Sequence, residues 1–121
     1  MCVVGGAVAM TAGPALAHHS FSMFDMSLPT EIEGTVEDFK LTNPHSSLLV
    51  KAKDKDGRAT TWRLEGGSPS VLDRAGWNAK TLKPGDQIKL TIWPVRGGAA
   101  SGMWDPKWVH FRDGKAIAAG H

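Results

Sequence analysis

The chain has 121 residues, of which 14 are Lys or Arg, 12 are Asp or Glu, five are His and one is Cys. This length fits a single domain, and the formal charge of +2 is too small to indicate a nucleic acid as partner. A lone cysteine excludes an internal disulfide and a zinc site built from several thiolates. The 41% hydrophobic content and the five Trp argue against a disordered chain, so we expect one small folded domain.

Residues 1–17 have the features of a secretory signal peptide. They carry no charge, and the apolar stretch from Val3 to Met10 is shorter than the roughly 20 residues that span a bilayer. The segment ends in Ala15-Leu16-Ala17, an A-x-A cleavage sequence. We therefore expect cleavage after Ala17, a periplasmic or secreted protein without a transmembrane segment, and His18 as the new N-terminus. The alternative is an apolar tail that stays attached, because the basic residue that usually begins a signal peptide is missing.

The first strands of the domain are predicted from short apolar runs between turn residues. With 14 Gly and 7 Pro in the chain, this pattern is typical of an all-β domain. The first expected strand covers residues 31–41, and the parity of its apolar residues changes near Glu37-Asp38, which predicts a bulge. The second and third strands cover residues 46–53 and 59–65, joined by an Asp-Gly hairpin turn.

A short helix is expected after the third strand. Ser68 is a favourable N-cap, Pro69 suits the first helical position, and Gly76 suits the left-handed conformation that often ends a helix. Because the helix has only about two turns, packing rather than intrinsic propensity has to stabilise it.

Two further strands lead to the fold class. The fourth alternates apolar and polar residues up to Pro94, and a glycine-rich loop over residues 97–102 precedes the fifth, which runs from Trp104 or Lys107 to Arg112. The order of three strands, a helix and two strands predicts a mainly β fold, a small five-stranded OB-like barrel with one short helix. An open α+β sheet is the main alternative. The expected division is a signal peptide, an N-terminal arm and an OB-like β domain, at residues 1–17, 18–30 and 31–121.

Short motifs along the chain match a known family. They read AHHSF at 17–21, EGTV at 33–36, TNPH at 42–45, WRLEGGSP at 62–69, GW at 76–77 and TLKPGD at 81–86. In order and spacing they resemble the family of small secreted bacterial proteins labelled domain of unknown function 6152, over nearly all of the processed chain to about Pro94. The resemblance implies an exported, OB-like domain, and it implies no established activity.

The favoured chemical site is a metal site at the processed N-terminus. The new α-amine and the imidazole of His18 can chelate one ion, and His19 can add its imidazole. Nitrogen ligands in a planar array suit Cu(II), and an amine and a histidine lose their protons to a metal near neutral pH. His45 follows the Asn43-Pro44 turn and can supply a third imidazole. The alternative is that His18 and His19 form a tail without function and that His45 is an ordinary turn residue.

Other donors are weaker candidates for this site. One is an imidazole in the last strand, and three are side chains close to the histidine pair in sequence: His110, Met23, Asp25 and Met26. Copper is therefore the cofactor that the sequence favours, with His18, His19 and His45 as its ligands.

A ligand surface is the second candidate. OB-type barrels often bind oligonucleotides or oligosaccharides on one sheet face, and aromatic rings with arginines can stack on a ligand. In an exported protein we expect a small ligand, a glycan or an envelope protein instead of a nucleic acid. We expect Trp62 and Trp77 in the core. An exposed patch for ligand binding is expected from Trp104, Trp108 and Arg96.

Catalysis has little support in the sequence. There is no G-x-S-x-G motif, and cleavage would remove the only cysteine. The carboxylates between Glu31 and Asp38 alternate along one strand, as on a solvated face, so they do not form an acid–base pair. We therefore expect an exported, periplasmic, non-enzymatic binding protein that binds copper, or alternatively an envelope-associated module that binds a ligand or protein.

Overall fold

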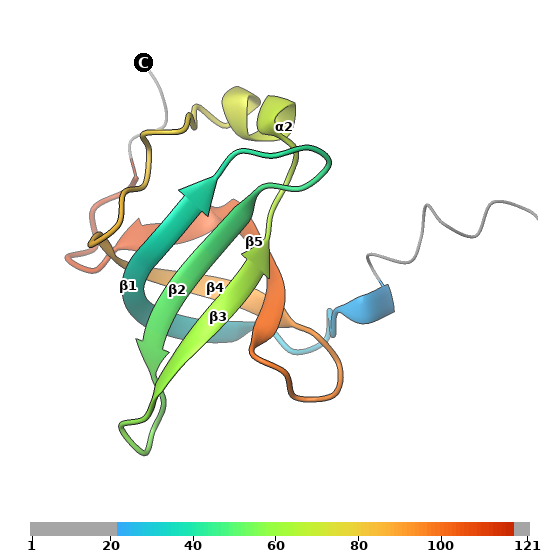
Figure 1. Ribbon diagram of the computed structural model, residues 1–121, viewed down its shortest axis with the longest axis vertical. Helices are drawn as coiled ribbons and strands as arrows, with labels where there is room; N and C mark the ends of the chain where they lie inside the picture. Colours follow the sequence, from blue (N-terminus) through green and yellow to red (C-terminus); the bar gives the residue numbers. More distant parts are fainter. Residues whose placement is uncertain (1–21, 118–121) are drawn as a thin grey trace, which may run out of the picture.

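The computed structural model describes residues 22–117, so the expected signal peptide and both histidines of the pair at 18–19 lie outside the described residues. Within that range the chain forms five strands and one short helix (Figure 1). Their bounds are β1 (Thr30–Lys40), β2 (Ser47–Lys53), β3 (Ala59–Glu65), α2 (Pro69–Arg74), β4 (Gln87–Pro94) and β5 (Ser101–Phe111).

The strands close into a barrel in the order β1-β2-β3-β5-β4, with β4 paired back to β1. All neighbours are antiparallel except β3 and β5, which pair in parallel over three residues. The predicted mainly β fold, with a closed five-stranded barrel and a single short helix, is confirmed. The alternative of an open α+β sheet is wrong, because β4 closes the barrel on β1.

Strand β1 closes the barrel because it is long and bent. Its first half pairs with β4 and its second half with β2, and the register with β2 shifts between Val36 and Asp38. The bulge predicted from the parity change is therefore present. At Gly34, where β1 has partners on both sides, a Cβ atom would collide with the carbonyl oxygen of Lys51. A residue without a side chain is needed there, since the two backbones approach so closely.

The core lies inside the barrel and under the helix. Its central side chains are fully buried and come from β1, β2, β3 and β4: Val36, Leu48, Val50, Leu64, Ile88, Leu90 and Ile92. At one end, Phe39 and Trp77 pack with Trp104, the ring centroids lying 5.3–6.0 Å apart. Trp77 is buried and Trp62 packs half-buried against this core, as expected.

Helix α2 covers this end of the barrel (Figure 1). The Ser68 hydroxyl accepts a hydrogen bond from the Val71 N–H at 3.4 Å, and Pro69 occupies the first turn, as predicted. Gly76 ends the segment with φ +84°. Leu72 is fully buried beneath the helix, so core packing stabilises this six-residue element.

Strand β5 begins earlier than predicted. It starts at Ser101 instead of Trp104 or Lys107, so Ser101 and Gly102 belong to the strand and not to the glycine-rich loop. Gly102 is buried where β5 pairs with the end of β4. A Cβ atom at this position would lie 2.8 Å from the Trp93 carbonyl oxygen. Because glycine has no side chain, the two backbones can approach here. For the same reason Gly102 does not contribute to the alternation of apolar and polar residues that predicts a strand.

We predict that Gly34→Ala lowers the free energy of unfolding by about 3 kcal/mol, because the new methyl group overlaps the backbone of β2. Gly57→Ala is the matched control. Gly57 has φ +79° with nothing within 4 Å of the added carbon, so only backbone strain of about 1 kcal/mol is expected. Urea unfolding of both variants measures the difference. An equal loss in the two variants would contradict the close approach of β1 and β2.

Candidate functional site

A mostly apolar hollow lies where the N-terminal arm, the β1–β2 loop, the start of α2 and strands β4 and β5 meet. We call it the groove, and its volume is about 380 Å³. Its lining residues are Phe24, Met26, His45, Glu65, Gly66, Gly67, Val71, Trp93, Met103, Trp104, Asp105 and Pro106. Apolar hollows with a few convergent polar groups are the usual form of a binding site, so the groove is the candidate site.

A bulge in β5 builds one wall of the groove. Between the partner pairs Leu90–Val109 and Ile92–Trp104, β4 advances two residues while β5 advances five. Among the extra residues, Lys107 and Trp108 are exposed, and the Lys107 N–H donates to the Asp105 carboxylate at 2.9 Å. This bulge separates the groove from a second hollow of about 620 Å³, which lies between α2 and β5.

The floor of the groove is formed where the β1–β2 loop is fastened to the end of β3. The Ser46 N–H donates to the Gly67 carbonyl at 3.0 Å, and the Gly66 N–H donates to the Ser46 carbonyl at 2.8 Å. The Trp104 indole packs on Gly66, where an added Cβ atom would lie 2.5 Å from the ring. Glycine at this position therefore leaves room for the Trp104 ring, which lines the groove.

The N-terminal arm forms the opposite wall. Figure 1 shows it, in blue, beside the loop that joins β4 to β5. Phe24 is buried and bridges antiparallel to Val95. The Asp25 N–H donates to the Pro94 carbonyl at 2.7 Å, and the Arg96 N–H donates to the Met23 carbonyl at 2.9 Å. The arm is thus fixed to the barrel by its own backbone bonds.

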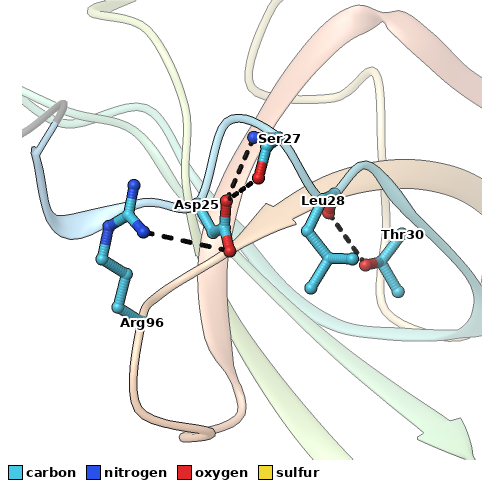
Figure 2. Close-up of polar contacts among 5 residues, drawn as sticks. All are labelled: Asp25, Ser27, Leu28, Thr30 and Arg96. Carbon is cyan, nitrogen blue, oxygen red and sulfur yellow. Dashed lines mark hydrogen bonds and ion pairs between the residues drawn. The ribbon is translucent and has the colours of Figure 1, made fainter.

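The side chain of Asp25 stabilises the turn that follows the bridge (Figure 2). Its carboxylate accepts hydrogen bonds from the Ser27 hydroxyl at 2.6 Å and from the Ser27 N–H at 3.1 Å, and it lies 4.0 Å from the Arg96 guanidinium. The Ser27 hydroxyl bond, then the backbone bond, then the Arg96 charge hold the pKa of Asp25 below its ordinary value. The turn is therefore most stable when Asp25 is ionised.

Among the predicted metal ligands that the structure describes, His45 lies in the groove. It is exposed, and the Thr42 hydroxyl donates to its carbonyl at 2.8 Å. Of the weaker candidates, Met26 lines the groove as well, whereas His110 pairs with Lys89 and lines a different hollow. In the described range 22–117 there is no group of three or more His, Cys, Asp or Glu that could hold a metal ion. His18 and His19 lie outside that range.

The expected exposed patch needs correction at Trp104. Only 2% of this residue is exposed, while Trp108 is 52% exposed. Trp104 lines the groove, Trp108 lines the hollow beside His110, and Arg96 pairs with Asp25 on the arm. The three residues therefore do not share one hollow. The Asp-Pro pair between the two tryptophans favours a loop, but it lies in the β5 bulge, with Trp104 buried before it and Trp108 exposed after it.

Two further residues of the groove are Met103, which no sequence motif marks as a site residue, and Trp93, one of several aromatic residues that could stack on a ligand. They are Cα partners across β4 and β5. Only the strand register, which depends on the early start of β5, brings them together.

No helix in the described part of the chain is both long enough and apolar enough to cross a membrane.

We predict that Ser27→Ala raises the pKa of Asp25 toward its ordinary value, because it removes the strongest of the bonds to the ionised carboxylate. Since the folded pKa is the lowered one, the anchoring by Asp25 is complete above the unfolded pKa and is lost as the pH falls through the folded pKa. As the pH falls, the Ser27→Ala variant should therefore lose the anchoring by Asp25 at a higher pH than the parent chain does. A carboxyl NMR titration measures this shift.

Thr30→Val serves as the control, because the Thr30 hydroxyl donates to the Leu28 carbonyl and makes no bond to Asp25 (Figure 2). Equal pKa values of Asp25 in the parent chain and in Ser27→Ala would show that the hydroxyl does not stabilise the turn.

The comparisons with known proteins identify a family. The model of a family of unknown function, DUF6152, matches residues 7–105, which is most of the chain. No curated protein and no solved structure matches the chain. The match includes the arm, four strands, the helix and the first half of β5. The chain therefore belongs to the DUF6152 family.

Proposed function

We propose that this chain is an exported, non-enzymatic binding protein whose ligand is a copper ion, taken up where the N-terminal arm passes His45. One observation carries the proposal: Phe24 and Met26 of the arm line the same groove as His45. His19 precedes Phe24 by five residues, which span up to about 17 Å when extended. The chain length therefore permits the histidine pair to reach the groove.

The proposed ligands of Cu(II) are the α-amine and imidazole of His18, with His19 and His45. No three nitrogen or carboxylate donors of the required types come together within residues 22–117. A nitrogen-rich Cu(II) site beside His45 therefore has to draw on the histidines that precede this range. Export and cleavage after Ala17 are part of the proposal, since cleavage creates the amine.

A second candidate function is favoured by the apolar character of the groove and of the neighbouring hollow. Val71, Asp105 and Pro106 line both, and Val71 is half-exposed on α2. An apolar ligand or a segment of an envelope protein would fit such a surface. This function requires Val71 and no histidine, so Val71→Glu would impair it while copper binding remains.

We predict that the exported protein has the intact mass of a chain beginning at His18 and binds one Cu(II) ion. His45→Ala should weaken Cu(II) binding by about tenfold or more, because one imidazole ligand is lost. His110→Ala is the control, since His110 lies in another hollow. Mass spectrometry and a competitive Cu(II) titration measure both quantities.

Three results would contradict the copper proposal. One is an exported chain that keeps residues ahead of His18. The others are a parent chain that takes up no Cu(II) and equal Cu(II) affinities of His45→Ala and His110→Ala.

A further inference from the structure

The methionines of the groove suggest a chemically different copper site, which shares His45 with the proposed Cu(II) chelate. We propose that the groove binds the reduced ion, Cu(I), through the thioether sulfurs of Met26 and Met103 and the imidazole of His45. This inference rests on the proposed function for its choice of copper as ligand. It differs in the oxidation state of the ion and in needing no residue before Ser22.

The strand register brings the donors to one surface. Met103 on β5 is the Cα partner of Trp93 on β4 and also of Glu65 on β3. Strands β3, β4 and β5 are therefore adjacent at Met103. The arm bridges the chain just after β4, at Phe24–Val95, in the antiparallel sense. Met26, in the turn that follows this bridge, and Trp93, near the end of β4, line the same groove.

Both methionines have flexible side chains, each with several rotatable bonds, that can adjust around an ion in the groove. Met103 is the strand partner of Trp93, and Met26 lies in the turn of the arm. Met26 is 47% exposed, which leaves its side chain room to turn into the groove. His45 borders the same hollow from the β1–β2 loop.

The chemistry of the lining selects a soft monovalent ion. Thioethers are soft ligands that favour Cu(I), whereas hard divalent ions prefer oxygen. The Trp93 indole can add a cation–π attraction, which strengthens when water is excluded by apolar neighbours such as Phe24. The carboxylates of Glu65 and Asp105 also border the groove and supply negative charge near the ion.

The test uses Ag⁺ as a probe, because it is a soft monovalent ion with the charge of Cu(I). The exported protein, labelled with carbon-13 at the methionine methyl groups, is titrated with silver nitrate and followed by NMR. We expect the methyl signals of Met26 and Met103 to shift together at one equivalent. The signal of Met23 should stay, because Met23 is 53% exposed on the same arm and does not line the groove.

The same inference can be tested by comparing the Ag⁺ affinities of variants. Met26→Leu combined with Met103→Leu keeps the side-chain volumes nearly unchanged and should weaken Ag⁺ binding at least about tenfold. Met23→Leu is the matched control and should bind Ag⁺ as the parent chain does. Unmoved methyl signals of Met26 and Met103 at saturating Ag⁺, or equal affinity of the double variant and the Met23→Leu control, would overturn the inference.

A chain with one residue added before His18 separates the two copper sites. If the proposed function is correct, this chain loses tight Cu(II) binding, and it should keep its Ag⁺ affinity if the groove is a soft-metal site. Loss of Ag⁺ binding in the extended chain, without an effect of the methionine substitutions, would refute the groove site. Absent Cu(II) binding in the parent chain, with Ag⁺ still bound at the two methionines, would refute the terminal chelate alone.

Discussion

Strand β5 has to pair with β3 on one side and with β4 on the other, and the groove results from this constraint. The parallel pairing with β3 fixes residues 101–103, and the antiparallel pairing with β4 resumes at Val109 only after a bulge. Trp104 turns inward at the first end of this bulge and packs on Gly66. Asp105 and Pro106 of the bulge line the groove and form one of its walls.

The arm completes the groove from the other side, and its position gives the site its chemical character. Phe24 and Met26 of the arm line it together with Trp93 and Met103. Two thioethers, an imidazole and two indoles therefore border one mostly apolar volume. Because backbone bonds and the ionised Asp25 fix the arm, the donors on it keep a defined relation to β4.

Much of the barrel could be predicted from the sequence, because its elements carry local signals. The bulge in β1 followed from a change of parity, and the helix from Ser68, Pro69 and Gly76. The start of β5 could not be predicted, since Gly102 is required by contact with a distant backbone and has no apolar side chain. For the same reason the burial of Trp104 was missed. Its sequence neighbours Asp105 and Pro106 favour a loop, whereas pairing with two strands sets its direction.

The candidate site was predictable only in its separate parts. His45 and Met26 were named from their residue types, but Met103 and Trp93 become neighbours through a register that joins three strands and the arm. The proposed Cu(I) site depends on sulfur ligands in the groove, and X-ray absorption at the copper edge of the Cu(I)-loaded protein observes them directly. The account predicts two sulfur neighbours and one imidazole nitrogen around the ion. A shell of nitrogen and oxygen alone would contradict it.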